Sequence, residues 1–228
     1  MRRDSKRKNF GDLSSVKFSP VTDSQARAAE AYASGKNVVM SGYAGTGKTF
    51  VALGLALEDL FAGKTDRVVV YRSAVPTRDM GFMPGTMAEK QAPYEIPYRA
   101  VVSELCGRGD AYDILKKNGS LDFSTTSYLR GLTVHRSVII VDEMQNMTFH
   151  ELDSIATRVG RDTRMILCGD YDQTDLVRDT DRFGLRKFLE IAEGMTEFAS
   201  VSMGPDDVVR SKFVKAYLVA KAARKALE

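Results

Sequence analysis

The stretch that most constrains this chain is Gly42-Tyr43-Ala44-Gly45-Thr46-Gly47-Lys48-Thr49, which has the G-x-x-x-x-G-K-[ST] spacing of a phosphate-binding loop. It follows a short apolar run over 37–41 and precedes a helical pattern over 50–61. This strand–loop–helix context matters because the loop aims backbone N–H groups and a helix N-terminus at phosphate oxygens. The alternative is an ordinary glycine-containing turn. Such a turn would require neither the complete motif spacing nor a strand before it and a helix after it. The sequence therefore predicts a binding site for a nucleoside triphosphate.

The residue types within the loop have separate physical reasons. Glycines at 42, 45 and 47 let the backbone approach an anion and take φ values that a β-carbon resists. Lys48 is expected to contact the β- and γ-phosphates, and the Thr49 hydroxyl is expected to ligate Mg²⁺.

Composition bounds the class of protein. With 228 residues, 43% hydrophobic and 28% charged, the chain is expected to form one soluble α/β domain. No apolar run approaches the roughly 20 residues of a membrane span, and the first residues lack the apolar stretch of a signal peptide. Cys106 and Cys168 form no CxxC pair, which favours a reduced compartment, so a cytoplasmic location is predicted. The net charge of +3 does not by itself indicate a nucleic-acid partner.

The order of segments predicts the fold. Residues 1–20 are interpreted as a basic, flexible arm and lead, either a solvated tail or a nucleic-acid contact, and 21–228 as a single domain. Apolar runs at 67–71, 137–141 and 165–168 alternate with helical patterns, which predicts a doubly wound, mostly parallel sheet. A long connection is expected from Arg72 to Pro97, then a helix from about Tyr98 to Leu105. A closing helix over 206–227 is expected to carry one apolar face, formed by Val209, Phe213, Tyr217 and Ala220.

Thr22-Asp23-Ser24-Gln25 has the T-x-x-Q form of a capping box, so a helix is predicted to start there and to end at Gly35. Thr148-Phe149-His150-Glu151 predicts a second helix start in the same way. Gln25 then has two possible roles that the residues do not separate. Its side chain could bond back to the Thr22 backbone, or it could read an adenine edge.

Further polar residues follow the predicted strands, at the sheet edge where open α/β folds place their sites. Asp142, after an apolar strand, is a candidate Mg²⁺ ligand, and Glu143 is a candidate general base for an attacking water. Gln173, after the next strand, could bridge the γ-phosphate and that water. The alternative for the carboxylate pair is an acidic cluster that leads a helix. No N-K-x-D run is present, so a GTPase is disfavoured, and hydrolysis fits a base beside the magnesium aspartate better than a kinase does.

Together these residues resemble the PhoH-like ATPases, single RecA-like cores related to superfamily one helicases. The resemblance covers about 22–217 and rests on the loop, Asp142-Glu143-Met144-Gln145-Asn146, and a more specific stretch from Phe82 to Tyr94. It implies ATP and Mg²⁺ as cofactors, with Gln25 as an adenine contact. It also implies a loose link to nucleic acid.

Two functions of different classes stay open. The first is Mg²⁺-dependent ATP hydrolysis coupled to binding, translocation on or remodelling of single-stranded nucleic acid, with possible helicase-type activity and RNA favoured over DNA. Basic residues expected near the carboxyl edge of the sheet favour such a polyanion: Arg72, Arg78, Lys90, Arg99 and Arg130. The alternative is that some of them meet the nucleotide. The second is a nucleotide-dependent switch or adaptor that acts on a protein partner.

Superfamily one helicases hold ATP between two RecA-like cores, and this chain has length for one. A homo-oligomeric ring with shared ATP sites is therefore expected, because a neighbour could supply the missing arginine. Arg210 is the first candidate for that arginine and Arg158 the second. The alternative for Arg210 is a contact within its own chain.

Overall fold

The core of the protein is one six-stranded sheet in which every pairing is parallel, with strand order β3-β2-β4-β5-β1-β6. The structure is a computed structural model, and it describes residues 10, 13, 15–73, 87–126, 133–170 and 179–225. The strands are β1 (Asn37–Gly42), β2 (Arg67–Arg72), β3 (Leu121–Thr125), β4 (Ser137–Asp142), β5 (Arg164–Gly169) and β6 (Phe198–Met203). The predicted α/β fold class, a doubly wound parallel sheet, is confirmed.

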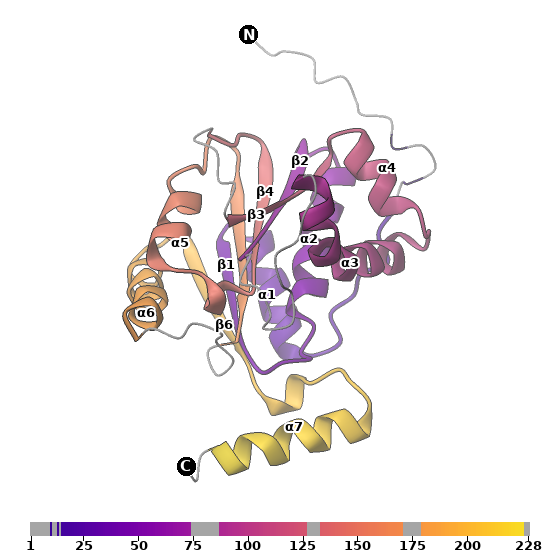
Figure 1. Ribbon diagram of the computed structural model, residues 1–228. Coiled ribbons are helices and arrows are strands. Elements are labelled where there is room, and N and C mark those ends of the chain that lie inside the picture. Colours follow the sequence, from indigo (N-terminus) through magenta and orange to yellow (C-terminus); the bar gives the residue numbers. More distant parts are fainter. Residues whose placement is uncertain are drawn as a thin grey trace.

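Helices cover both faces of this sheet (Figure 1). The covering helices are α1 (Asp23–Ala33), α2 (Lys48–Phe61), α3 (Met87–Cys106), α4 (Ala111–Lys117), α5 (Phe149–Ala156) and α6 (Asp179–Glu193). A further helix, α7 (Lys212–Lys225), follows β6. Helices α1 to α4 contribute to one buried apolar cluster, and α5 and α6 contribute to the other. Because side chains alternate along a strand, Val138 and Ile140 enter the first cluster while Ile139 and Val141 enter the second. The uninterrupted apolar runs thus belong to strands buried on both faces, as predicted.

Two predicted helix starts are confirmed by their caps. Thr22 accepts a hydrogen bond from the Gln25 backbone N–H, and Thr148 forms a full capping box with Glu151. The Gln25 side chain, however, does not bond back to Thr22. Its Oε1 accepts from the Val21 N–H instead.

The prediction of a connection up to Pro97 is wrong, because α3 starts at Met87 and contains both Pro93 and Pro97. Local sequence argued against a helix there, since each proline removes one backbone donor. Tertiary packing outweighs that cost. Tyr98 is buried against the sheet, and Glu95, 2% exposed, accepts hydrogen bonds from Tyr112 and Lys116 of α4. Helix α4 itself had no counterpart in the sequence reading.

The end of the chain also differs from the prediction. The closing helix begins at Lys212, after a 3-10 turn over Pro205–Asp207, and its predicted apolar face is exposed to solvent. Phe213 is 79% and Tyr217 60% exposed. Figure 1 shows α7 lying apart from the sheet and its covering helices, beyond the end of β6.

The proposed boundary at residue 20 stays a prediction, although parts of the lead touch the domain. Leu13 is buried, Phe18 lies against Gly54 of α2, and the Lys17 N–H bonds the Leu105 carbonyl. Within the ranges that the structure describes, no helix has the length and apolar character needed to cross a bilayer.

Candidate nucleotide site

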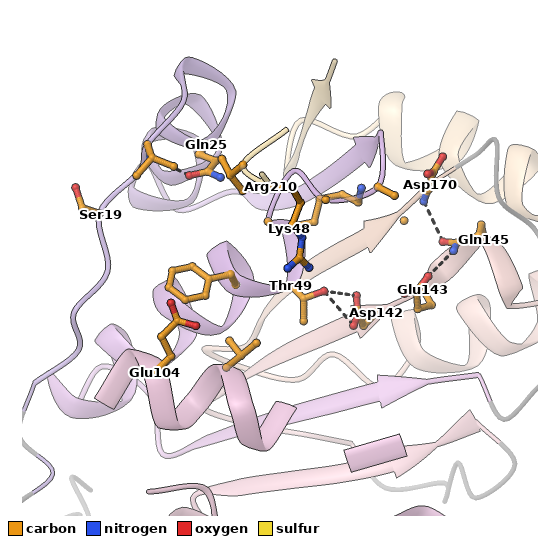
Figure 2. A pocket seen from close by; sticks show the side chains of 18 residues that line it. Ser19, Gln25, Lys48, Thr49, Glu104, Asp142, Glu143, Gln145, Asp170 and Arg210 are labelled. Atoms are coloured by element: carbon orange, nitrogen blue, oxygen red, sulfur yellow. Dashed lines mark hydrogen bonds between the residues drawn. The ribbon is translucent and has the colours of Figure 1, made fainter. Parts of the chain in front are cut away.

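The carboxyl ends of β1, β4 and β5 surround a cavity of about 560 Å³, which is the size of an ordinary small-molecule site. Its lining combines the phosphate loop with residues from the lead before α1, from α3 and from the segment after β6. Figure 2 shows Asp142 beside Thr49 at the start of α2, with Gln25 on one side of Lys48 and Glu143, Gln145 and Asp170 on the other, while Ser19 and Glu104 lie further away. The topology therefore brings together the loop and the strand-end carboxylates that the sequence singled out.

The three loop glycines all have positive φ, at 121° for Gly42, 78° for Gly45 and 81° for Gly47. Their surroundings differ, however. A β-carbon on Gly42 would lie 2.1 Å from the Met203 carbonyl oxygen, so this glycine is required for the close approach of β6. A β-carbon on Gly47 would lie 3.0 Å from Gln25 Nε2. Five residues of the loop line the cavity: Ala44, Gly45, Gly47, Lys48 and Thr49. The other three do not, and one of these, Thr46, is fully buried.

Lys48 is held over its own loop. Its Nζ donates 2.7 Å hydrogen bonds to the carbonyl oxygens of Gly42 and Tyr43. Burial lowers the pKa of Lys48, and the Asp170 carboxylate opposes that shift. A third, longer contact of 3.4 Å joins Nζ to the Thr46 hydroxyl. An ammonium group carries three donors, so exchanging this weak contact would let Lys48 reach an anion in the cavity.

Thr49 and Asp142 meet across the site although 93 positions separate them in the sequence. The Thr49 hydroxyl donates to the two carboxylate oxygens of Asp142 at 3.0 and 3.2 Å. Burial, followed by the neighbouring Glu143, raises the pKa of Asp142. A hydroxyl and a carboxylate are oxygen donors of the kind that hold Mg²⁺ beside phosphates, so the pair fits that ion.

Asp142 has a second partner that the sequence did not reveal. The Tyr98 hydroxyl of α3 donates to it at 2.8 Å, and the positive charge of Arg72 lies close to both groups. Both contacts oppose the effect of burial on the pKa of Asp142. Arg72 therefore lies at the carboxyl edge of the sheet, as expected, where it acts on Tyr98 and Asp142. Whether it also faces a polyanion stays a prediction.

Glu143 has a left-handed backbone with φ of 53°, which is a strained conformation for a residue with a side chain. Gln145 holds its carboxylate in place. The Gln145 Nε2 donates to Glu143 at 2.5 Å, while its Oε1 accepts from the Asp170 N–H at 3.0 Å (Figure 2). Gln145 is 3% exposed, and a β-carbon on Gly169 would lie 2.9 Å from its Oε1. The side-chain amide of Gln145 thus connects the segment after β4 with the end of β5.

Gln25 reaches the site from α1. Its Nε2 donates to the Thr46 carbonyl at 2.9 Å, and its Oε1 accepts from Val21, so both ends of the amide already bind backbone. One N–H and one lone pair remain for a base. The cavity is also lined by Phe50, Val101 and Glu104.

The two candidate arginines lie in different places. Arg210 lines its own chain's cavity, and a β-carbon on Gly45 would lie 3.0 Å from its Cγ. This is the arrangement within one chain that the sequence reading held as the alternative. Arg158 follows α5 near the start of β5, at the amino edge of the sheet, and bonds the Ser154 carbonyl. Gln173 falls outside the described residues, as do Arg78, Arg130, residues 82–86 of the Phe82–Tyr94 stretch and the first nine residues.

Tyr98 and Gln145 are among the residues around the site that sequence reasoning missed as functional. Tyr98 had no local signal, because its partner lies 44 positions away on another element. Gln145 stood in a recognised run, but its contact to Asp170 depends on how β4 and β5 pair.

A phosphate loop at the end of β1, with paired carboxylates at the end of β4, places this domain in the class of P-loop nucleoside triphosphatase folds. The chain belongs to the PhoH-like protein family. The family model described as "PhoH-like protein" matches residues 17–221, nearly the whole chain. The resemblance inferred from the sequence is confirmed.

Curated relatives agree with this assignment. Protein PhoH of Escherichia coli K12 is 35% identical over 176 residues, covering 76% of this chain and 49% of that protein. A PhoH-like protein of Bacillus subtilis is 32% identical over 181 residues, covering 77% of this chain and 56% of the relative. The chain therefore spans about half the length of the curated relatives it matches.

Similar solved structures include the Sulfolobus solfataricus SWI2/SNF2 ATPase core in complex with dsDNA, which is 12% identical with a TM-score of 0.47. That match covers 85% of this chain and 46% of the other. Pif1 helicase from Candida albicans is 17% identical with a TM-score of 0.42, over 82% of this chain and 40% of the helicase.

Proposed function

We propose that this chain is a cytoplasmic, Mg²⁺-dependent ATPase domain that couples hydrolysis to binding or remodelling of single-stranded nucleic acid, with RNA favoured over DNA. One observation carries the ATPase assignment. The hydroxyl of Thr49 and the buried carboxylate of Asp142 lie 3.0 Å apart, with Glu143 next in the chain and Lys48 in the same cavity. Hydrolysis needs this combination of phosphate contact, metal ligand and base.

Each side chain has a separate task in that proposal. Lys48 and Arg210 offer cationic donors to the terminal phosphates, and Thr49 with Asp142 would hold the metal. Mg²⁺, when bound, neutralises charge on the β- and γ-phosphates. Glu143, oriented by Gln145, accepts a proton from water. Gln25 is the candidate adenine contact, and Gln173 remains a candidate for positioning the water.

The coupling to nucleic acid is tested by measuring ATP turnover with and without single-stranded RNA and single-stranded DNA. We expect stimulation by RNA, and binding that weakens steeply as salt rises, because phosphate contacts release counterions. Hydrolysis that neither polymer changes, without binding at low salt, would instead support the alternative function, a nucleotide switch acting on a protein partner.

The proposal includes a homo-oligomeric ring with shared sites. Since Arg210 lies in its own chain's cavity, Arg158 is the better candidate for an arginine donated to a neighbour. A donated arginine can contribute about 10³–10⁵ in rate. Mixing Lys48→Ala protein with Arg158→Ala protein should then restore activity, because some sites would pair an intact Lys48 with an intact Arg158. An absence of recovery would remove Arg158 from this role.

A further inference from the structure

Helix α7 presents an outward stripe that combines aromatic and cationic side chains. Phe213, Tyr217, Lys221 and Arg224 are spaced i, i+4, i+8 and i+11, which places them along one side of a helix. All four are exposed. The sequence of α7 contains no Asp or Glu, and within the described chain Lys221 and Arg224 make no ion pair. We call these four residues the α7 stripe.

A surface with matching chemistry lies at the opposite end of the molecule. The segment from Glu190 to Glu197 closes α6 and leads into β6, so it lies at the amino edge of the parallel sheet. It exposes two apolar side chains, Ile191 at 49% and Met195 at 42%. Three carboxylates, Glu190, Glu193 and Glu197, accompany them. Glu190 pairs with Arg186 of α6, so within the described residues Glu193 and Glu197 are the two carboxylates of the segment without an ion pair. We call this segment the α6–β6 turn.

We propose that the α7 stripe docks on the α6–β6 turn of a second copy of this chain, head to tail. Both surfaces pair large apolar groups with charges, and the charges are opposite in sign. Exposed aromatic residues that enter an apolar patch are the usual anchors of protein interfaces, while opposite charges at the rim set orientation and on-rate. A contact between two α7 helices is disfavoured, because it would bring like charges together.

The position of α7 connects this contact to the nucleotide site. The Val209 N–H bonds the Gly45 carbonyl at 3.0 Å, and Leu218, on the inner side of α7, lies against Gly45 as well. A copy docked on α7 by its amino edge would also bring the edge that carries its Arg158 toward this end of the molecule. The link between this docking and a shared ATP site rests on the proposed function. The contact itself does not, because it requires no hydrolysis.

The surfaces lie at opposite edges of one domain, so the contact is heterologous. Contacts of this kind close into a ring or continue as a filament. Two buried aromatic side chains account for roughly 300–500 Å², a fraction of the approximately 1,600 Å² of a standard interface. We therefore expect assembly that depends on protein concentration and weakens with salt.

A charge exchange tests the proposal. Lys221→Glu with Arg224→Glu reverses the stripe, and Glu193→Lys with Glu197→Lys reverses the turn. Each pair of substitutions should weaken assembly by at least about tenfold, measured as molar mass by sedimentation velocity at low and high salt. The four substitutions in one chain, or an equimolar mixture of the two double variants, should restore it. Lys117→Glu, an exposed change on α4, is the control that should leave the mass unchanged.

Three outcomes would overturn the proposal. These are a parental chain that stays monomeric at all concentrations, a double variant that assembles normally, and a combined variant that does not recover. If reversal of the stripe instead removes RNA binding while the mass is unchanged, the stripe is a nucleic-acid surface. Since mass is measured without turnover, a chain that assembles as expected but hydrolyses no ATP would refute the proposed function and leave the docking intact.

Discussion

The nucleotide site and α7 are neighbours, but the side chains of the site are buried and hydrogen-bonded whereas the aromatic side chains of α7 are exposed. At the site, Asp142 receives hydrogen bonds from Thr49 and Tyr98, and Gln145 ties β4 to β5. Helix α7 leaves its aromatic side chains in solvent and touches the phosphate loop through its inner side. The side chains of the nucleotide site are therefore fixed by hydrogen bonds within the chain, most of them buried. A surface for a partner can remain open until that partner arrives.

The largest expected effect is at the centre of the site. Lys48→Ala should abolish hydrolysis and weaken ATP binding more than ADP binding, because the ammonium is expected on the terminal phosphates. Turnover and calorimetric titration of both nucleotides test this. Near-parental turnover in a folded Lys48→Ala protein would contradict the assignment of the loop.

Glu143→Gln should retain Mg·ATP binding and slow turnover by roughly 10²–10⁴-fold, the usual contribution of a positioned general base. The substitution keeps the shape of the side chain and removes the proton acceptor. Single-turnover kinetics with a separate binding assay distinguish the two effects. Loss of binding together with turnover would make Glu143 a structural or metal-holding residue.

Gln145→Ala should slow turnover by about 10–10²-fold at nearly unchanged ATP affinity, since a displaced base loses efficiency. Gln145→Glu is the informative partner, because it keeps the length of the side chain but places a second carboxylate beside Glu143. We expect its defect to lessen at lower pH, where one carboxyl of the pair binds a proton. Equal defects at every pH would indicate a packing role instead.

Tyr98→Phe should move the acid limb of the pH–rate profile toward higher pH. Burial already raises the pKa of Asp142, and the Tyr98 hydroxyl opposes that rise. Without the hydroxyl the carboxylate therefore protonates at higher pH, and a protonated Asp142 is a poor metal ligand. The profile should be measured at low and saturating Mg²⁺, with the shift larger at low Mg²⁺. An unchanged limb would separate Tyr98 from the chemistry.

The smallest expected effect is on stability at α7. Phe213→Ser should change the free energy of unfolding by no more than about 0.5 kcal/mol, because Phe213 is exposed. Leu53→Ala, in the buried core, should cost about 2–5 kcal/mol. Denaturant unfolding of both variants at low protein concentration makes the comparison. A large loss for Phe213→Ser would show that α7 is part of the folded core, and so remove the contrast between the two regions.

The sequence by itself determined the parts of this protein that depend on neighbours in the chain. Apolar runs indicated strands buried on both faces, the Thr22 and Thr148 caps indicated helix starts, and the loop spacing indicated a phosphate site. The edge at which Asp142 and Glu143 meet the loop followed from parallel strand order, because parallel strands end together.

Only the tertiary structure decided the rest. Helix α3 runs through two prolines because it buries Tyr98 and Glu95, and no local pattern shows such a gain. The contacts of Tyr98 with Asp142 and of Gln145 with Asp170 join elements that the chain brings together from a distance. The helical spacing of the α7 stripe would be the same if the stripe were buried. Periodicity shows which residues share one face of a helix, but only the tertiary structure shows whether that face is covered.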